Sequence, residues 1–442
     1  MRIVFIPIDN RPVCYTLPQQ IAQIDESVEL VMPKREWLGD LTKCADIDKI
    51  FEWLRNLSQF DAVIISLDTI AYGGLIPSRR SSDSLDMINQ RLKNLKEILF
   101  SQKGAKIYAF SSIMRISNNN VNEEEKIYWS DWGKKIFEYS YNLDKYGFVE
   151  NNEIPEDILE DYLKTREKNF EINKIYLEWQ KSGFLDTLIF SKDDCAQFGL
   201  NVREAKELEK LGGFVKTGAD EIPLSLLSRV LNPVKVAPVF LEPEYKDLIS
   251  NYEDISVEKS VLGQLELANC TVTGEKDADI VLFVNNFKKN QGEIVMGVDT
   301  EPFNQKWNKP QKPYMVADVR FANGADNRFV KEFFKFGLDE KFYGYSAWNT
   351  TANTLGSLIC AMKFRFLAKK YNDKAFKRVQ LVRLLDDWAY QANVRQKKPD
   401  LKQLKSEMKK YEQIVFDKIN LVEDLEYKFP WNRFFEVEIE FN

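Results

Sequence analysis

Short apolar runs that do not alternate with polar residues are the feature that most restricts the folds open to this chain. In the first 120 residues these runs cover 3–8, 30–32, 62–67 and 106–110. Apolar residues recur at helical spacing between the runs, at 18–24, 46–57 and 84–99. A strand that is apolar on both sides must be covered on both sides, as in parallel sheets whose strands are joined by helices. The sequence therefore predicts an α/β protein.

The same alternation resumes after residue 182, so the chain is long enough for more than one such unit. About ten strand candidates exceed what a single eight-stranded barrel uses. We therefore expect two doubly wound, mostly parallel units: residues 1–232, carrying a helical insertion at 122–182, and residues 233–370. A C-terminal helical and tail segment, 371–442, packs on the others. The alternative is a β/α barrel that ends near residue 285 and carries a C-terminal extension.

The 442-residue chain contains no histidine. Histidine-dependent nucleophiles, histidine metal ligands and histidine pH switches are therefore excluded, and acid–base chemistry must use Asp, Glu, Tyr, Lys or Cys. The net charge of −6 gives no basic surplus for nucleic acid, and no apolar stretch reaches the roughly 18 residues of a membrane span. Five scattered cysteines indicate a reducing compartment. We expect a cytoplasmic protein with no nucleic-acid or membrane partner and leave its oligomeric state open.

Polar residues gather directly after the predicted strands. In parallel α/β folds this edge of the sheet binds ligands. Asp and Asn at these positions also cap helices and form turns, but capping does not call for arginines or for a Tyr-Gly-Gly sequence. We therefore expect a polar substrate to be bound by Asp9, Asn10, Arg11, Asp68, Tyr72, Arg115, Asp318, Arg320, Asn323, Trp348 and Asn349.

Two pairs of adjacent acidic residues, Asp193-Asp194 and Asp220-Glu221, follow strand-like runs. Like charges held close together raise one pKa of the pair, so that one residue type supplies both an acid and a base. The same oxygen atoms are suitable ligands for a divalent cation, and in each pair one residue alone can cap the next helix. We predict that these four residues are catalytic.

Several short motifs form an ordered series that resembles a bacterial family catalogued as domain of unknown function 4127. They are 8–13 (Ile-Asp-Asn-Arg-Pro-Val), Asp68-Thr69 with 72–75 (Tyr-Gly-Gly-Leu), Asp193-Asp194, 218–221 (Gly-Ala-Asp-Glu), Asp318-Val319-Arg320 with Asn323-Gly324, 348–350 (Trp-Asn-Thr) with 353–356 (Asn-Thr-Leu-Gly), Asp386-Asp387 with Tyr390-Gln391, and 429–433 (Phe-Pro-Trp-Asn-Arg). The resemblance covers essentially the whole chain. It implies a shared architecture and carries no established activity.

Three functions fit these residues. The first is a hydrolase that acts on a carbohydrate or glycoside, since two carboxyl groups suffice for that reaction. Asp220 or Glu221 would be the acid and Asp193 or Asp194 its partner, with a small molecule or oligosaccharide as substrate and no cofactor. The second is a hydrolase or phosphoryl-transfer enzyme assisted by Mg²⁺ or Mn²⁺. The third is a two-lobed binding protein for a polar small molecule. For the first, we expect Asp9, Arg11, Asp68, Arg115, Asp194, Glu221 and Asn349 to line one cleft.

Overall fold

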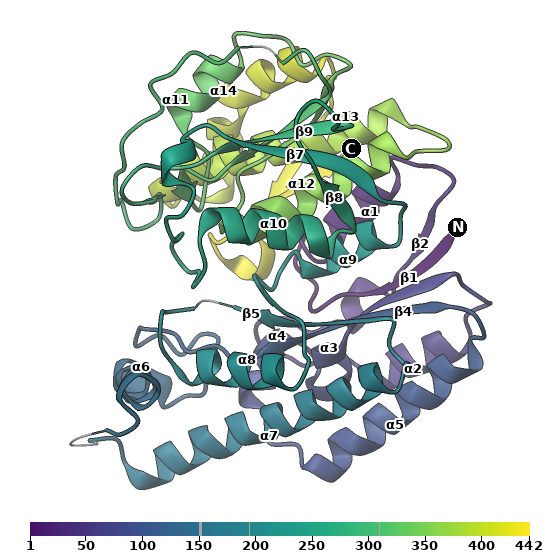
Figure 1. Ribbon diagram of the computed structural model, residues 1–442, viewed down its shortest axis with the longest axis vertical. Coiled ribbons are helices and arrows are strands. Elements are labelled where there is room, and N and C mark those ends of the chain that lie inside the picture. The colour runs from purple at the N-terminus through teal and green to yellow at the C-terminus, as the bar shows by residue number, and fades with distance from the viewer. Residues whose placement is uncertain (150–152, 194, 309) are drawn as a thin grey trace. The chain divides into compact units, whose positions relative to one another are not determined.

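The computed structural model describes residues 1–149, 153–193, 195–308 and 310–442. The chain forms two compact units (Figure 1), each with its own parallel sheet. Unit 1 comprises Met1–Tyr15, Glu29–Pro223 and Tyr252–Asp254, and unit 2 comprises Thr16–Val28, Leu224–Asn251 and Ile255–Asn442. The chain therefore changes unit near residue 223, nine residues before the boundary expected at 232, and the early segment that includes α1 (Thr16–Ala22) belongs to unit 2.

The sheet of unit 1 is open and fully parallel, with the order β2-β1-β3-β4-β5-β6. After β1 the chain adds β2 on one side and all later strands on the other. In doubly wound sheets ligands bind at this reversal, outside the carboxyl ends of the two strands that flank it. Here those strands are β1 and β3. The strands are β1 (Arg2–Ile6), β2 (Glu29–Val31), β3 (Ala62–Ser66), β4 (Lys106–Ile113), β5 (Thr187–Lys192) and β6 (Val215–Thr217).

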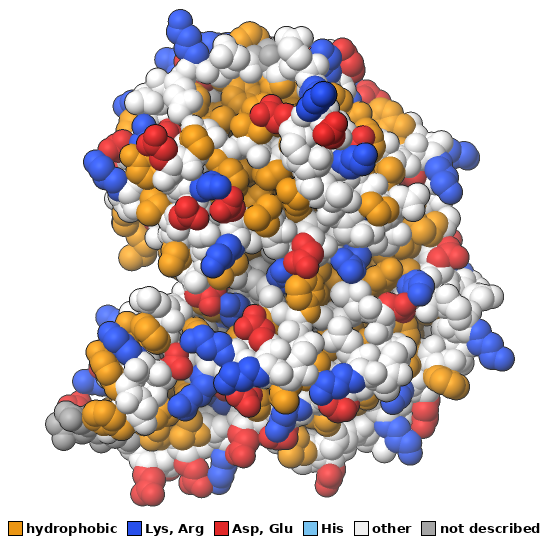
Figure 2. All heavy atoms as spheres, viewed as in Figure 1, with side chains coloured by type: hydrophobic (Ala, Val, Ile, Leu, Met, Phe, Trp, Pro, Cys, Tyr) orange, Lys and Arg blue, Asp and Glu red, His pale blue; other side chains and the backbone are white. Residues whose placement is uncertain are grey.

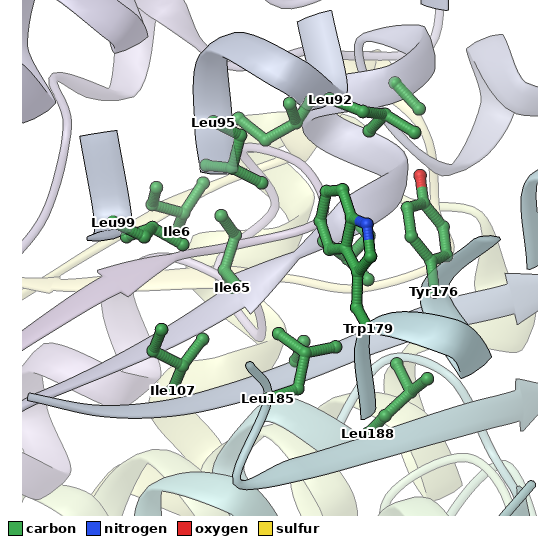
Figure 3. Close-up of a cluster of buried hydrophobic side chains, with 14 of the residues drawn as sticks. Ile6, Ile65, Leu92, Leu95, Leu99, Ile107, Tyr176, Trp179, Leu185 and Leu188 are labelled. Atoms are coloured by element: carbon green, nitrogen blue, oxygen red, sulfur yellow. The ribbon is translucent and has the colours of Figure 1, made fainter. Parts of the chain in front are cut away.

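One face of this sheet packs on helices in the main core of unit 1. Figure 3 shows Ile6, Ile65 and Ile107, from three neighbouring strands, within the same apolar cluster as Leu95 and Trp179 from two helices. Burying a side chain of this size contributes about 1.5–3 kcal/mol to the free energy of folding. The strands and the helices that share this core therefore stabilise one another. The helical elements of unit 1 are η1 (Arg35–Trp37), α2 (Ile47–Arg55), α3 (Leu67–Tyr72), α4 (Leu75–Arg80), α5 (Leu85–Ser101), α6 (Trp129–Tyr146), α7 (Glu156–Lys181) and α8 (Leu200–Lys210).

The expected helical insertion at 122–182 contains α6 and α7. A second apolar cluster packs part of this segment: Met114 and Ile116 follow β4 and contact Trp129, Ile136 and Tyr162. The loop between β4 and α6 thereby lies at the carboxyl edge of the sheet. This loop carries three consecutive glutamates, at 123–125.

The sheet of unit 2 has the order β13-β11-β9-β7-β8, again fully parallel and open. Its chain reverses between β7 and β9, so both units share one type of doubly wound order. The prediction of two doubly wound parallel units is confirmed, and the barrel alternative is wrong because neither sheet closes. The strands are β7 (Val234–Phe240), β8 (Cys270–Val272), β9 (Ile280–Asn285), β11 (Tyr314–Asp318) and β13 (Phe342–Ser346).

One face of the second sheet packs on α10 and α12 through aliphatic side chains such as Leu282, Val261 and Leu358. The other face carries aromatic rings: Phe283 of β9 packs edge-to-face on Trp307 with ring centroids 5.1 Å apart. The helical elements that complete the second half of the chain are α9 (Ile222–Arg229), η2 (Pro243–Tyr245), α10 (Val257–Leu267), α11 (Asn327–Phe333), α12 (Thr351–Phe366), α13 (Asp373–Arg383), the π-helix η3 (Leu384–Val394), η4 (Arg395–Lys397), α14 (Leu401–Ile419) and η5 (Pro430–Asn432).

Two small sheets of unit 2 have no counterpart among the predicted strands. One pairs β10 (Gly292–Glu293) with β12 (Phe321–Ala322), and the other is an antiparallel hairpin of β14 (Leu425–Lys428) and β15 (Glu438–Phe441). The strands β10 and β12 have two residues each and are too short for any pattern, whereas β14 and β15 alternate apolar and polar residues, a signal that a search for continuous apolar runs does not use. No helix in the described part of the chain is long and apolar enough to cross a membrane. Figure 2 shows basic and acidic side chains interspersed over the visible face.

Candidate active site at the carboxyl edge of unit 1

Arg11 joins two acidic residues at the carboxyl edge of the first sheet. Its Nη2 lies 2.7 Å from Asp9 Oδ2 and 2.5 Å from Asp220 Oδ1. Asp9 also accepts hydrogen bonds from Nε and the backbone N–H of Arg11, at 2.9 and 3.0 Å. All three side chains are at most 10% exposed. The planar guanidinium thus holds the residues after β1 and those after β6 in one fixed arrangement.

Two more arginines bind Asp193, the residue directly after β5. Arg79 of α4 donates from Nη2 to Asp193 Oδ2 at 2.9 Å, and Arg115 Nη1 lies 3.4 Å from the same oxygen. Both arginines also bind glutamates of the β4–α6 loop. Arg79 Nη1 lies 3.2 Å from Glu124 Oε2, and Arg115 Nε lies 3.1 Å from Glu125 Oε1. Asp193, Glu124 and Arg115 keep 14–22% of their side-chain surface exposed, so this part of the edge reaches solvent.

We call these eight residues the arginine–carboxylate cluster: Asp9, Arg11, Arg79, Arg115, Glu124, Glu125, Asp193 and Asp220. The pKa of Asp220 shows that the Arg11 group and the Asp193 group of this cluster interact electrostatically. Burial raises the pKa of Asp220, the charges of Asp193 and Asp9 raise it further, and the Arg11 guanidinium opposes the shift. Asp220 is therefore a carboxyl group that retains its proton more readily than an exposed aspartate does.

Asp68 lies next to this cluster but inside the protein. It is 1% exposed and accepts hydrogen bonds from the Ser112 backbone N–H at 2.8 Å and from Ser111 Oγ at 3.3 Å. Burial raises its pKa to about 7, although these hydrogen bonds and the charge of Arg79 oppose the shift. Asp68 has the electrostatics of an active-site acid without direct access to solvent.

The Tyr72-Gly73-Gly74 sequence ends a helix. Gly73, with φ of +91°, is the left-handed C-cap of α3, and a Cβ atom placed there would lie 2.6 Å from Cβ of Cys44. Glycine is therefore required by both backbone conformation and space. The Tyr72 side chain is 2% exposed and belongs to the main core of unit 1.

A pocket of about 650 Å³ lies in unit 1 beside the cluster. Glu125 lines it, and the same carboxylate binds Arg115, which in turn binds Asp193. Tyr128 supplies an aromatic ring whose hydroxyl donates to Asp161 at 2.9 Å. The remaining lining residues are Leu41, Thr42, Arg80, Asn122, Glu123, Lys126 and Ile127. The pocket therefore combines carboxylates, cations and an aromatic ring. The Arg115 guanidinium connects its lining residue Glu125 to Asp193.

Asp318 and Arg320 lie in unit 2 and are 0% exposed. Asp318 accepts hydrogen bonds from Tyr345 at 3.0 Å and Asn285 at 2.7 Å, and burial with the nearby charge of Asp326 raises its pKa to about 7. Arg320 donates to Asn285 Oδ1 at 3.1 Å, to the Glu301 carbonyl at 2.9 Å and to Glu242 Oε1 at 3.0 Å. These contacts connect the carboxyl ends of β9 and β11 within the unit.

Asn323, Trp348 and Asn349 also lie in unit 2. The two asparagines adopt left-handed backbone conformations, with φ of +60° and +57°, and the Asn323 N–H donates to the Asn349 carbonyl at 2.8 Å. Trp348 is 1% exposed and packs edge-to-face on Phe435. Turn formation and packing account for these contacts. Their expected role in substrate binding remains a prediction.

The other predicted residues belong to unit 1. Glu221 is 1% exposed and precedes α9, and the Asn10 carbonyl accepts a hydrogen bond from Arg35 Nε at 2.9 Å. Asp194 lies outside the described residues. Within the parts of the chain that are described, no three Cys, Asp or Glu side chains are arranged to hold a metal ion.

The predicted site residues left out Arg79, although it follows the third strand run, and they also left out Glu124 and Glu125. Arg79 lies on a short helix after the Tyr-Gly-Gly turn, and the two glutamates belong to the segment interpreted as a helical insertion. The adjacent Arg79-Arg80 pair and the run of three glutamates at 123–125 were the available signals. Runs of like charge usually mark solvated surfaces, and only the fold brings these two together.

The fold and the site define a two-unit, doubly wound α/β protein whose first unit gathers arginines and carboxyl groups at the carboxyl edge of its sheet. The chain belongs to the family described as protein of unknown function (DUF4127), whose model matches residues 3–440. No curated protein matches it. One solved structure, a "ugt transferase" from Siraitia grosvenorii in complex with UDP, aligns over 94% of this chain and 99% of its own, with 10% identity and a TM-score of 0.21.

Proposed function

We propose that this protein is a hydrolase acting on a carbohydrate or glycoside, with Asp220 as the proton donor and Asp193 as the partner carboxylate. The observation that carries the proposal is the contrast between these two groups at one sheet edge. Asp220 is buried and its pKa is raised, in part by the charge of Asp193. Asp193 is more exposed and is bound by two guanidinium groups. When two carboxyl groups lie in such different environments, one can act as the acid and the other as its ionised partner.

In the proposed reaction, Asp220 gives its proton to the glycosidic oxygen as the bond to the leaving group breaks. Asp193 either attacks the anomeric carbon, forming a glycosyl ester that water then hydrolyses with Asp220 taking up the water's proton, or removes a proton from the water that attacks the anomeric carbon directly. Arg79 and Arg115 keep the Asp193 carboxylate in place, and Arg11 orients Asp220. Since protonation by a positioned carboxyl group and a second carboxylate suffice for this chemistry, no histidine is required.

The charge of the cluster favours a neutral polyol over a phosphate. Five of the eight residues are carboxylic acids and three are arginines, and each arginine already contacts at least two of the acids. A phosphate would need guanidinium groups that are available to it. Sugar hydroxyls, by contrast, can donate to carboxylate oxygens, and the Tyr128 ring in the neighbouring pocket offers a surface for a sugar ring.

The test is a hydrolysis screen of the full chain against chromogenic aryl glycosides and natural oligosaccharides, repeated with Asp220→Asn and Asp193→Gly. The matched control is Asp186→Asn. Asp186 precedes the strand β5 that Asp193 follows, and its side chain binds Lys106 at the other end of the sheet. We expect both site variants to lose activity and the control to keep it. Azide should partly restore Asp193→Gly on an activated substrate if Asp193 is the nucleophile, because the small anion occupies the space of the missing carboxylate.

Two results would refute the proposal. One is glycoside hydrolysis that survives both site substitutions. The other is the absence of hydrolysis together with tight sugar binding, which would favour the two-lobed binding protein. Activity that disappears in EDTA and returns with Mg²⁺ or Mn²⁺ would favour the metal-assisted alternative.

A further inference from the structure

Unit 2 contains a cavity of about 340 Å³ beside β13, the strand at the open edge of its sheet. This volume is at the lower end of the range for small-molecule sites. The cavity is lined by residues of the loop before β13, of β13 itself, of α12 and α13, of the segment that joins these two helices and of the end of α14. These are Leu338, Asp339, Glu340, Phe342, Arg365, Tyr371, Asp373, Phe376, Lys377, Gln380, Ile419 and Asn420.

Gln380 is the feature that distinguishes this cavity from a gap in packing. Its side chain is 2% exposed, and its Oε1 accepts a hydrogen bond from the Tyr345 backbone N–H at 2.9 Å. The described residues provide no acceptor for its Nε2, which lies on a side chain that lines the cavity. Nε2 is not one of the fully buried atoms without a partner, so it can be reached from the cavity and is available to a ligand. A ligand with an acceptor atom at this position would satisfy it.

Four of the lining residues form an apolar part of the cavity wall. Phe342 and Phe376 are both nearly buried, with ring centroids 6.4 Å apart, and Leu338 and Ile419 add aliphatic surface. Aromatic side chains favour stacked or edge-to-face contacts with another ring. This apolar part of the wall suits a planar ring better than a flexible chain with many hydroxyl groups.

The rim carries a surplus of negative charge. Arg365 is occupied by the carbonyls of Phe342 and Glu340 and by the ring of Phe376 at 4.3 Å, and Lys377 is paired with Asp373 at 2.8 Å. Glu340 is exposed, and its carboxylate has no ion-pair partner among the described residues. A phosphate or carboxylate group would be repelled here, whereas a neutral or singly positive molecule would not.

We propose that this cavity binds a heteroaromatic ring of nucleobase size, uncharged or singly cationic, that accepts a hydrogen bond from Gln380 Nε2. The site belongs to unit 2 alone and does not depend on the hydrolase proposal. Adenosine, guanosine, cytidine and uridine are suitable probes because they present ring acceptors without a phosphate. AMP carries the same base as adenosine and adds a phosphate.

Binding of these probes to the full chain is measured by saturation-transfer NMR and thermal shift, with Gln380→Glu as the main variant. Glutamate keeps an oxygen for the Tyr345 N–H and removes the donor that faces the cavity. We expect at least one nucleoside to bind and Gln380→Glu to weaken that binding by about tenfold or more. The exposed Gln413, on α14 of the same unit, is the control: Gln413→Glu should leave binding unchanged.

A second variant keeps the test decisive if Gln380→Glu does not fold. Glu340→Lys reverses an exposed rim charge and should raise the affinity for AMP relative to adenosine by about threefold. The proposal is overturned if no nucleoside binds at millimolar concentration. It is also overturned if binding is indifferent to Gln380→Glu in the folded protein, or if Glu340→Lys leaves the preference between AMP and adenosine unchanged.

Discussion

Arg11 and Asp220 are 209 positions apart in the sequence, yet the guanidinium Nη2 of Arg11 lies 2.5 Å from Asp220 Oδ1. The same nitrogen lies 2.7 Å from Asp9 Oδ2. One arginine therefore joins the residues after the first strand of the sheet to those after its last strand. Removing it would leave two buried carboxyl groups without their counter-charge.

Arg11→Met should destabilise unit 1 by about 3–5 kcal/mol, because breaking a buried ion pair from one side leaves uncompensated charge. Arg11→Lys should cost less stability but should still reduce activity on any substrate, since an ammonium group cannot reproduce the planar fork. Urea unfolding measures the first effect. Arg203, which is exposed on α8, is the control, and Arg203→Met should stay within about 0.5 kcal/mol of wild type. Equal stability of the two Met variants would contradict the role of Arg11.

Asp220→Asn should lower the catalytic rate by about 10² or more, the usual contribution of a general acid. Since burial raises the pKa of Asp220, the pH–rate profile of the wild type should fall on its alkaline side as Asp220 loses its proton. In Asp220→Asn that alkaline limb should disappear together with the rate. A variant that melts earlier but keeps its rate would return Asp220 to a purely structural role.

Stability against unfolding should fall as the pH rises from about 4 to about 7. Burial raises the pKa of Asp68, Asp318 and Asp387 from 3.8 to about 7, so the folded protein keeps protons that the unfolded chain has lost in this window. The unfolded state then binds fewer protons, which makes the slope of stability with pH negative. Each group contributes at most about 4 kcal/mol, because one pKa unit corresponds to about 1.4 kcal/mol.

Asp68→Asn tests the predicted pH dependence of stability in unit 1, because asparagine cannot titrate and keeps an oxygen for the Ser112 N–H. Denaturant unfolding at about pH 5 and about pH 8 should show a smaller difference for Asp68→Asn than for wild type. The same substitution at the exposed Asp131 should leave the difference as it is in wild type. An unchanged pH slope in Asp68→Asn would show that this group titrates normally.

Tyr72→Phe and Tyr176→Phe should each raise stability by about 1 kcal/mol, since a buried hydroxyl without a partner is costly. Both hydroxyls lie in the core of unit 1 with no hydrogen-bond partner among the described residues. Comparing the two variants also distinguishes a role of the Tyr72 hydroxyl in packing from a role in substrate binding. A KM that rises for Tyr72→Phe alone would assign its hydroxyl to the substrate, as the sequence predicted. A loss of stability in both variants would reveal hydrogen bonds to buried water.

The sequence by itself determined most strands and helices of the two parallel sheets and the kinds of residue at the strand ends, but not β8 or the strands of the two small sheets. Runs such as 62–67 and the helical spacing at 84–99 correspond to β3 and α5 because both patterns arise from contacts between near neighbours in the chain. The Asp, Asn and Arg residues after those runs could be identified for the same reason: a parallel sheet brings its carboxyl ends to one edge.

Only the tertiary structure decided which of these residues meet. It brings Arg79 into contact with both Asp193 and two glutamates of the β4–α6 loop, and it encloses Asp318 and Arg320 completely within unit 2. No local pattern encodes these pairings. They join residues that are far apart in the sequence, so they depend on the order of strands in each sheet and on how the loops pack. The same dependence on distant packing raises the pKa of Asp220, whose neighbours in the sequence neither bury it nor supply the charges around it.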